Sequence, residues 1–435
     1  MKGSPHAPSL ILIDVFIILF VFLIHLVFFL NRWVTDFYFA GYVDSNLHYF
    51  HDYVVRMADG SVPYRDFPIE YPPLAVLFLW LLRPFADSFK HFETAFITVM
   101  LVFSILCLIV WKSAQRGAPA TQTISGGVSY GLAVLAVGPI TLVSVDYIPA
   151  FFTALCLLLL CRGRLFLSGL CLGAAAAAKG YPVILLPVAL FIVIKQHKEI
   201  GLERLKQFKQ FNFILLGFLA SLAASVLPAM LMNPSGFLKS YTYHFERAIE
   251  LGSAYSALLL PLRFAGVQFI TQFDHGSWNL SGNIFTSAAN RISPFILLSL
   301  LAFVYFRIFT TIRVNPRQSM SNNLFSAQSF AVAIAAFILG FKVGSPQFLV
   351  WLLPFIPYLV KGTRGWLMLA LFVLIGHLQQ WIFPWHWSSL VHLNTLPIII
   401  LLVEKLLMVI FFIVLVGAHD RAPLHQCNQR NQRLK

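Results

Sequence analysis

The chain has 435 residues, of which 59% are hydrophobic and 11% are charged, and its mean hydropathy is +0.78. A soluble domain carries about 25% charged residues. This surplus of apolar side chains cannot be buried in one aqueous core, so much of it must face lipid. The composition therefore excludes a soluble enzyme. The formal net charge of +14 would suit nucleic acid, but the placement of the basic residues argues against such a partner.

Apolar runs along the chain predict an all-α, polytopic bundle with about twelve membrane-spanning helices, in a range of roughly ten to thirteen. Several of the runs are shorter than the roughly 20 residues that a perpendicular span needs, so they are tilted, re-entrant or extended by their loops. The predicted spans are Leu10–Leu30, Glu93–Trp111, Gly127–Val145, Tyr147–Cys161, Leu165–Ala178, Tyr181–Lys195, Phe211–Met232, Pro294–Thr311, Ser326–Phe341, Pro346–Val360, Gly365–Phe383 and Pro397–Gly417.

The basic residues orient this bundle. With the N-terminus inside, 18 of the 31 Lys and Arg residues fall on cytoplasmic segments, and only 11 fall on the longer segments of the opposite side. Twelve of the 17 carboxylates fall outside. This positive-inside pattern places both termini in the cytoplasm, where the basic charge meets anionic lipid.

The domain organisation follows from these spans. Residues 1–417 are expected to form a single transmembrane domain, and residues 418–435 a basic, disordered cytoplasmic tail. Two large extracytoplasmic loops, 31–92 and 233–293, are expected to carry short interfacial helices. The run Pro73–Phe85 has about 13 residues, too few to span, and suits an interfacial or re-entrant helix.

The first of these loops is acidic, unlike the rest of the chain. Its segment Ser45–Ala58 places Leu47, Phe50, Val54 and Met57 on one face of a predicted helix. Asp44 then stands at the N-terminus of that helix, where a carboxylate caps free N–H groups and meets the positive end of the helix dipole.

Several short motifs occur in a fixed order across the chain. Asp44 is followed by Gly60-x-x-Pro63-Tyr64-x-Asp66-Phe67 and by Tyr71-Pro72-Pro73-Leu74. Three later segments continue the series: Lys179-Gly180-Tyr181-Pro182, Tyr243-His244-Phe245-Glu246-Arg247, and Ser345-Pro346-Gln347-Phe348-Leu349-Val350-Trp351. This order resembles the GT-C superfamily of membrane glycosyltransferases. It is most similar to the bacterial polyprenyl-phosphate-mannose-dependent mannosyltransferases of the glycosyltransferase 87 family.

The resemblance implies a GT-C type of fold and an inverting transfer of a sugar, expected to be mannose, from a polyprenyl-phosphate donor to an acceptor hydroxyl. The acceptor must lose a proton to a carboxylate, and the leaving phosphate needs cationic partners. By position, Asp44 matches the catalytic base of such enzymes; its other interpretation is the helix cap alone. Because Asp44-Ser45-Asn46 lacks a second carboxylate, we predict no metal and no cofactor. His48 and His51 share a face with Asp44, which leaves a transition-metal site as the alternative.

Further residues of the motifs are candidates for substrate contacts, and each also has a purely structural interpretation. Expected partners of the donor phosphate are Lys179, His244, Arg247 and Lys342. Glu70, Tyr71 and Gln347 are expected to contact the sugar or the acceptor. Glu70 would otherwise cap a helix, Tyr71 would belong to an aromatic belt, and Lys179 would extend to the interface. Arg247 would otherwise pair with Glu246 or Glu250.

Two other functions fit the same sequence. A lipid or polysaccharide transporter or flippase would use charged residues within the spans, such as Asp14, Glu404 and Lys405. An inactive GT-C-like subunit would keep the fold without turnover. The expected partners are the lipid-linked donor, a glycolipid or glycan acceptor and membrane lipid, while the oligomeric state stays open. The expected location is the plasma membrane of a bacterium, with the endoplasmic reticulum membrane as the alternative.

Overall fold

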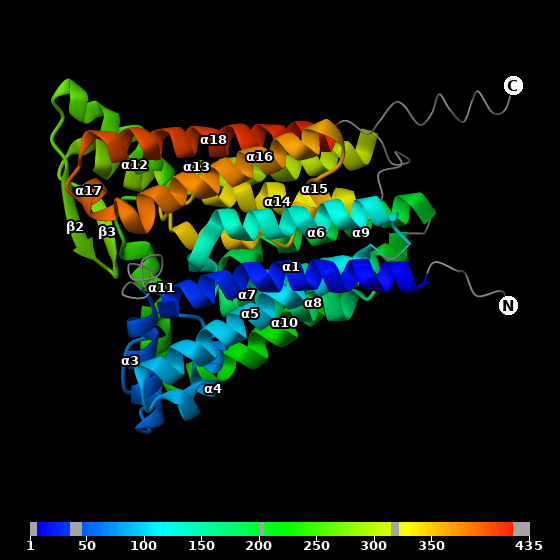
Figure 1. The fold of residues 1–435 in the computed structure, drawn as a ribbon, viewed down its shortest axis with the longest axis horizontal. Helices are drawn as coiled ribbons and strands as arrows, with labels where there is room; N and C mark the ends of the chain where they lie inside the picture. The colour runs from blue at the N-terminus through cyan, green and yellow to red at the C-terminus, as the bar shows by residue number, and fades with distance from the viewer. Residues whose placement is uncertain (1–6, 35–45, 116, 201–203, 315–321, 421–435) are drawn as a thin grey trace, which may run out of the picture.

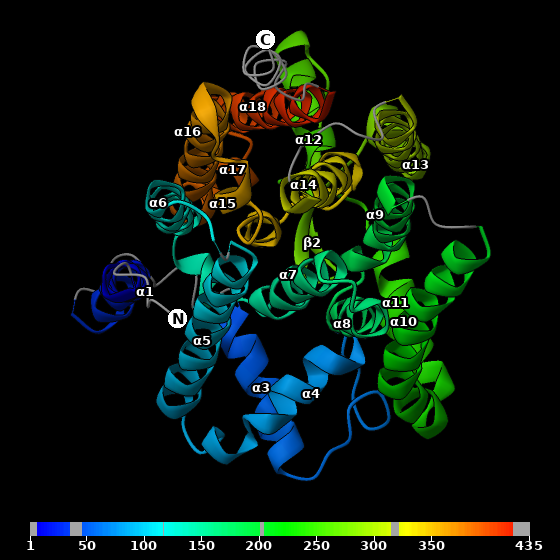
Figure 2. The same cartoon turned by 90° about the vertical axis from the view of Figure 1, so that its right-hand side faces the viewer.

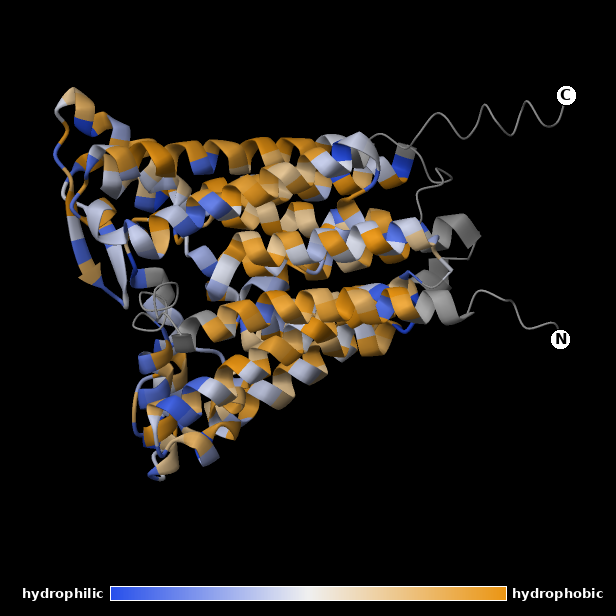
Figure 3. Cartoon of the chain, in the orientation of Figure 1, coloured by the Kyte–Doolittle hydropathy of each residue, from blue (hydrophilic) through white to orange (hydrophobic). Residues whose placement is uncertain are grey.

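The structure of the chain is a computed structural model that describes residues 7–34, 46–115, 117–200, 204–314 and 322–420. Helices lie side by side along the long axis of the molecule (Figure 1). Hydrophobic residues cover most of their length, and hydrophilic ones gather toward both ends, most densely at the end that carries α3 and the strands (Figure 3). This distribution is that of a membrane-spanning bundle, and the predicted all-α, polytopic class is confirmed.

Seven helical segments of the described residues are long and apolar enough to cross a membrane by length and composition. Each consists of all or most of one helix: α5 (Phe89–Ala114), α6 (Ala120–Val137), α10 (Arg204–Met232), α13 (Ile284–Val314), α14 (Asn322–Gly340), α16 (Gly362–Gln380) and α18 (Thr395–Asp420).

Further helices complete the bundle. They are α1 (Ala7–Val34), α7 (Tyr147–Cys161), α8 (Leu165–Ala178) and α9 (Leu185–Ile200), which the 3-10 turn η4 (Tyr181–Ile184) precedes. The start of α1 and the end of α18 lie at the same end of the bundle (Figure 1). That arrangement agrees with the prediction that both ends of the chain share one side of the membrane.

One predicted span is not a regular helix. The stretch Pro346–Val360 forms the 3-10 helix η6 (Pro346–Leu352) and the four-residue α15 (Ile356–Leu359). Pro346, Pro354 and Pro357 each lack an N–H donor, and the latter two interrupt the ladder that a continuous helix needs. Residues 348–360 are all buried, so protein rather than lipid surrounds this irregular backbone, as its free polar groups require.

Glycines bring α8 and α10 into close contact. A Cβ on Gly169 would lie 2.1 Å from the carbonyl oxygen of Ile214, and one on Gly173 would lie 2.4 Å from that of Phe218. The reverse holds at Gly217, where a Cβ would lie 2.2 Å from the carbonyl oxygen of Phe166. Small residues four apart allow such backbone approach between membrane helices. This packing fixes α8, whose C-terminal end carries Lys179.

Short elements gather at the opposite end from the start of α1 (Figure 1). From the first loop come α3 (His48–Ala58), α4 (Pro73–Leu81) and the 3-10 turn η2 (Arg83–Phe85). The predicted helix in this loop is confirmed over residues 48–58, and its face of Leu47, Phe50, Val54 and Met57 is buried. The predicted short helix 73–85 is also confirmed as α4 and η2, and α3 and α4 lie beside α5 and α8 (Figure 2).

The second loop departs from the expectation of helices alone. It holds α11 (Pro234–Glu246), α12 (Ala254–Leu259) and the 3-10 helix η5 (Leu260–Ala265). It also holds a small antiparallel sheet of order β1-β3-β2. The strands are β1 (Ile249–Glu250), β2 (Ile270–Asp274) and β3 (Ser277–Ser281). His275 and Gly276 join β2 to β3 with φ of 51° and 65°, as a tight hairpin turn requires.

The remaining short segments lie between the last long helices or follow α6. They are η3 (Gly138–Thr141), the π-helical turn η7 (Trp381–Trp385) and α17 (Trp387–Val391). Because α6 ends at Gly138-Pro139, the predicted span 127–145 is shifted toward the N-terminus. The residue that follows Val145 is Asp146, at the start of α7.

Candidate functional site

Glu70 lies at the end of the first loop, where two tyrosines of α3 hold its carboxylate. The hydroxyls of Tyr49 and Tyr53 lie 2.8 and 2.7 Å from Oε2 of Glu70 and 2.5 Å from each other. Burial, together with the negative charge of Glu70, raises the pKa of both phenols. They therefore stay neutral and act as donors to a carboxylate whose position is fixed.

Tyr71 follows Glu70 and faces the interior. Its ring meets that of Phe50 edge-on at 5.3 Å, and its backbone carbonyl accepts a hydrogen bond of 2.5 Å from the hydroxyl of Tyr64. Burial is the main reason that the pKa of Tyr71 is raised, followed by the charges of Glu70 and Asp146. The carboxylate of the first loop and a second carboxylate within the bundle thus both act on Tyr71.

That second carboxylate forms a buried ion pair with Lys179. Nζ of Lys179 lies 2.7 Å from Oδ1 of Asp146, and the two side chains are 20% and 1% exposed. The indole of Trp351 donates to the same oxygen at 2.5 Å. Trp351 in turn stacks on Tyr181 and on Phe348, with ring centroids 4.0 and 4.1 Å apart. The positive charge of Lys179 is therefore balanced by a carboxylate, and aromatic rings lie beside its ammonium.

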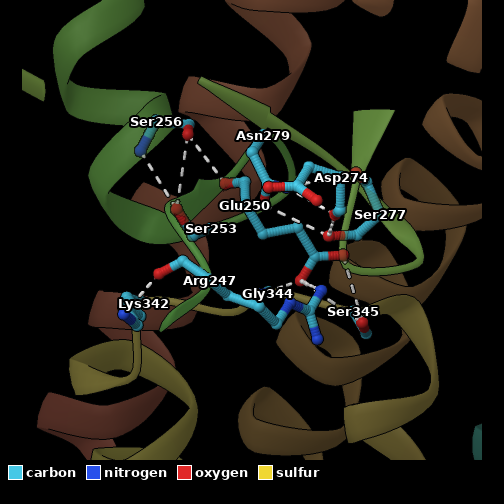
Figure 4. A network of polar contacts seen from close by, with 10 residues as sticks. All are labelled: Arg247, Glu250, Ser253, Ser256, Asp274, Ser277, Asn279, Lys342, Gly344 and Ser345. Carbon is cyan, nitrogen blue, oxygen red and sulfur yellow. Dashed lines mark hydrogen bonds and ion pairs between the residues drawn. The ribbon is translucent and has the colours of Figure 1, made fainter. Parts of the chain in front are cut away.

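A second cationic group lies where β1 meets the start of η6 (Figure 4). Glu250 is buried and accepts hydrogen bonds from the backbone N–H of Gly344 at 2.8 Å and from the hydroxyl of Ser345 at 3.2 Å. The guanidinium of Arg247 lies 3.8 Å from the same carboxylate. Lys342 donates to the carbonyl oxygen of Arg247 at 2.5 Å and to Oδ1 of Asn290 at 3.1 Å.

This group brings two cationic side chains, Arg247 and Lys342, close together. The guanidinium of Arg247 lies near the carboxylate of Glu250, and the ammonium of Lys342 donates to the backbone carbonyl of Arg247 and to Asn290 (Figure 4). Burial and the like charge of Arg247 lower the pKa of Lys342. In the described part of the chain, Nε of Arg247 is buried without a hydrogen-bond partner. Such an arrangement favours an anion that accepts hydrogen bonds.

Close backbone contact holds the two sides of this group together. A Cβ on Gly344 would lie 2.4 Å from the carbonyl oxygen of Gly252, and one on Gly252 would lie 2.6 Å from that of Gly344. The element η6 then continues from Ser345, beside Glu250, to Phe348 and Trp351, beside Lys179. One short element therefore connects both cationic groups, with Gln347 between them.

Tyr243 of α11 connects the two loops. Burial and the charge of Glu70 raise its pKa to about 12, while the charge of Arg247 acts in the opposite direction. Its hydroxyl also packs against Gly276 of the hairpin, where a Cβ would lie 2.8 Å from the Tyr243 hydroxyl oxygen. The start of α11 is fixed to the first loop as well, since Nδ2 of Asn233 donates to the carbonyl of Tyr64 at 3.1 Å.

Some predicted residues are not part of this arrangement. Asp44 lies outside the described residues, and so does the side chain of His244, whose backbone belongs to α11. The ring of His48 stacks on Phe89 at 3.8 Å, and Nε2 of His51 lies 3.2 Å from the carbonyl oxygen of Ala86. Among the described residues, no three metal-binding side chains lie close enough to hold an ion.

One family of known proteins matches the N-terminal part of the chain. The family described as GPI transamidase subunit PIG-U matches residues 12–249, which is more than half of the chain. The chain belongs to the PIG-U family. This is a different family from the glycosyltransferase 87 family that the motifs resemble. No curated protein sequence matches the chain significantly.

Two solved structures are similar in outline to this PIG-U family member. Both are of ArnT from Cupriavidus metallidurans, one bound to undecaprenyl phosphate and one in the apo state. The identities are 13% and 14% and the TM-scores 0.43 and 0.44. The matches cover 86% and 87% of this chain and 72% and 73% of the two ArnT chains.

The PIG-U match includes most of the candidate site and one residue that sequence reasoning did not single out. Glu70, Tyr71, Asp146, Lys179 and Arg247 lie within residues 12–249, whereas Lys342 and Gln347 lie beyond them. Asp146 was missed because it stands as a short interruption between two apolar runs. A lone carboxylate between two spans is costly in lipid unless it has a partner. This cost could have indicated that Asp146 pairs with a cationic side chain.

Proposed function

We propose that the chain is a GT-C type glycosyltransferase that moves a sugar from a polyprenyl-phosphate donor to a hydroxyl of a glycolipid or glycan acceptor. The sugar is expected to be mannose, and the reaction takes place on the extracytoplasmic side. The observation that carries this proposal is the pair of cations Arg247 and Lys342, with Nε of Arg247 unpartnered among the described residues. They lie at the end where both loops meet.

The chemistry assigns one role to each side of the site. The acceptor oxygen forms a bond to the anomeric carbon and gives its proton to the carboxylate of Asp44. The bond from the anomeric carbon to the phosphate oxygen breaks, and its electron pair stays on the leaving polyprenyl phosphate. Arg247 and Lys342 stabilise that added negative charge. Attack from the face opposite the phosphate inverts the configuration.

Arg247 and Lys342 suit the phosphate better than Lys179 does. Lys179 is paired closely with Asp146 at 2.7 Å, whereas the guanidinium of Arg247 lies 3.8 Å from Glu250 and so is less tightly neutralised. We therefore assign Lys179 to positioning η6 through Asp146 and Trp351. Glu70, with Tyr49 and Tyr53 as fixed donors, is assigned to hydroxyls of the sugar or the acceptor, and Gln347 to the sugar.

A second candidate function has support from the family match. The description of PIG-U as a subunit of GPI transamidase favours a protein that holds a lipid-linked glycan phosphate at the same cations without turnover. It also favours the endoplasmic reticulum membrane over the plasma membrane of a bacterium. The two functions share the phosphate site and differ in whether Asp44 acts as a base.

The test compares two substitutions in the first loop. Purified protein is incubated with radiolabelled polyprenyl-phosphate mannose and a panel of glycolipid acceptors, as wild type, as Asp44→Asn and as Asp52→Asn. The proposal expects transfer by the wild type and by Asp52→Asn, and a loss of at least about 100-fold in Asp44→Asn, with donor binding retained. Donor binding without transfer by any of the three proteins would establish the subunit function instead.

A further inference from the structure

A cavity of about 300 Å³ lies between α1 and α5, away from the loops that form the candidate site. Ile17 and Ile18 of α1 and Leu108 and Ile109 of α5 supply apolar walls. Asp14 and Lys112 add one charge of each sign to the lining. The cavity thus combines an apolar surface with a charged pair.

The charged pair is close and partly exposed. Nζ of Lys112 lies 2.7 Å from Oδ1 of Asp14, with the side chains 29% and 35% exposed. Lys112 also donates to the hydroxyl of Thr123 at 3.4 Å, and the exposed parts of both side chains face the cavity lining. The indole Nε1 of Trp111, in the same lining, is buried without a described partner. The lining therefore offers one partly exposed anionic group and one partly exposed cationic group.

The position of the pair along the helices corresponds to a membrane surface. Lys112 lies in the last turn of α5, and Leu108 lies one turn deeper. Asp14 lies about two turns from the start of α1. With the start of α1 in the cytoplasm, the charged pair lies at the headgroup level of the inner leaflet and the apolar walls lie at the level of acyl chains.

We propose that this cavity binds a phospholipid with a zwitterionic headgroup that carries a primary ammonium, of the phosphoethanolamine class. The ammonium donates to Asp14, the phosphate contacts Lys112, and an acyl chain lies along Ile17, Ile18, Leu108 and Ile109. A phosphocholine headgroup has no N–H to donate to Asp14, and a purely anionic headgroup is repelled by it.

The test measures headgroup preference directly. Wild-type protein in mixed micelles with equal amounts of phosphatidylethanolamine, phosphatidylcholine and phosphatidylglycerol is analysed for bound lipid by native mass spectrometry. We expect phosphatidylethanolamine to be retained about tenfold over either competitor, from one charge-assisted hydrogen bond. Equal retention of the three lipids, or preference for phosphatidylglycerol, would overturn the proposal.

Variants then assign the preference to this cavity. Asp14→Asn should remove the preference for phosphatidylethanolamine over phosphatidylcholine, whereas Lys112→Gln should weaken retention of all three phospholipids alike. Ile18→Trp fills the cavity and should reduce bound lipid, while Leu19→Trp, on the exposed surface of the same helix, is the matched control. A preference that survives both Asp14→Asn and Ile18→Trp would contradict the assignment.

Discussion

The ion pair of Lys179 with Asp146 gives the most quantitative prediction. Asp146 is 1% exposed and the side chain of Lys179 is 20% exposed. Lys179→Met leaves a buried carboxylate without its cation, which costs about 3 to 5 kcal/mol in the free energy of unfolding. In Asp146→Asn, the flexible side chain of Lys179 can reach water, and the new amide oxygen still accepts from Trp351. The free energy of unfolding should therefore fall by about 2 kcal/mol. The lysine substitution should therefore be the more damaging one.

The double variant Asp146→Asn/Lys179→Met removes both charges at once. We expect it to lose about 2 kcal/mol less than the sum of the two single losses. Thermal unfolding in detergent, followed with a thiol-reactive dye that reports the buried Cys107 and Cys156, measures all four proteins. The reasoning is refuted if Asp146→Asn is more destabilising than Lys179→Met, or if the two losses are additive.

Two further predictions concern the contact between the loops. Gly344→Ala should lower the unfolding temperature and the affinity for the donor, because its Cβ would lie 2.4 Å from the carbonyl oxygen of Gly252. The control is Gly180→Ala, whose Cβ would have no atom within 4 Å. Equal effects of the two substitutions would contradict this prediction. The pKa of Tyr243 is about 12 in the folded chain and near 10 in the unfolded chain. Between these pH values its phenol is neutral in the folded chain and ionised in the unfolded one. Its contribution to stability is therefore full below pH 10 and is lost between pH 10 and 12. The ultraviolet titration difference between wild type and Tyr243→Phe should centre near pH 12, and a centre near 10 would contradict the assigned neighbours.

The helices could be predicted from the sequence because each is a local run of apolar residues. Tyr147–Cys161 and Leu165–Ala178 agree with α7 and α8 residue for residue. The face of α3 was readable from the spacing of Leu47, Phe50, Val54 and Met57. The three prolines of 346–360 indicated that no continuous helix forms there. The uniform hydrophobicity of this stretch nevertheless predicted a span.

The candidate site was only partly predictable, because its contacts join residues far apart in the chain. Asp146 is 33 residues from Lys179 and 205 from Trp351, and no local pattern pairs them. Glu250 entered the sequence interpretation only as a possible partner of Arg247, whereas the structure makes it the centre of a network that includes Ser345, 95 residues away. The hairpin β2–β3 was missed since its strands have only five residues each; the His275-Gly276 pair between them was its one signal.

Binding of the lipid-linked donor tests the central claim most directly. Equilibrium binding of radiolabelled polyprenyl-phosphate mannose is measured for wild type, for Arg247→Gln and for Lys239→Gln, an exposed lysine of α11 away from the network. The account predicts that Arg247→Gln weakens binding by about 10- to 100-fold, from the loss of a charge-assisted contact, while Lys239→Gln binds like the wild type. Donor binding that is unchanged in Arg247→Gln, or absent in the wild type, would contradict the account.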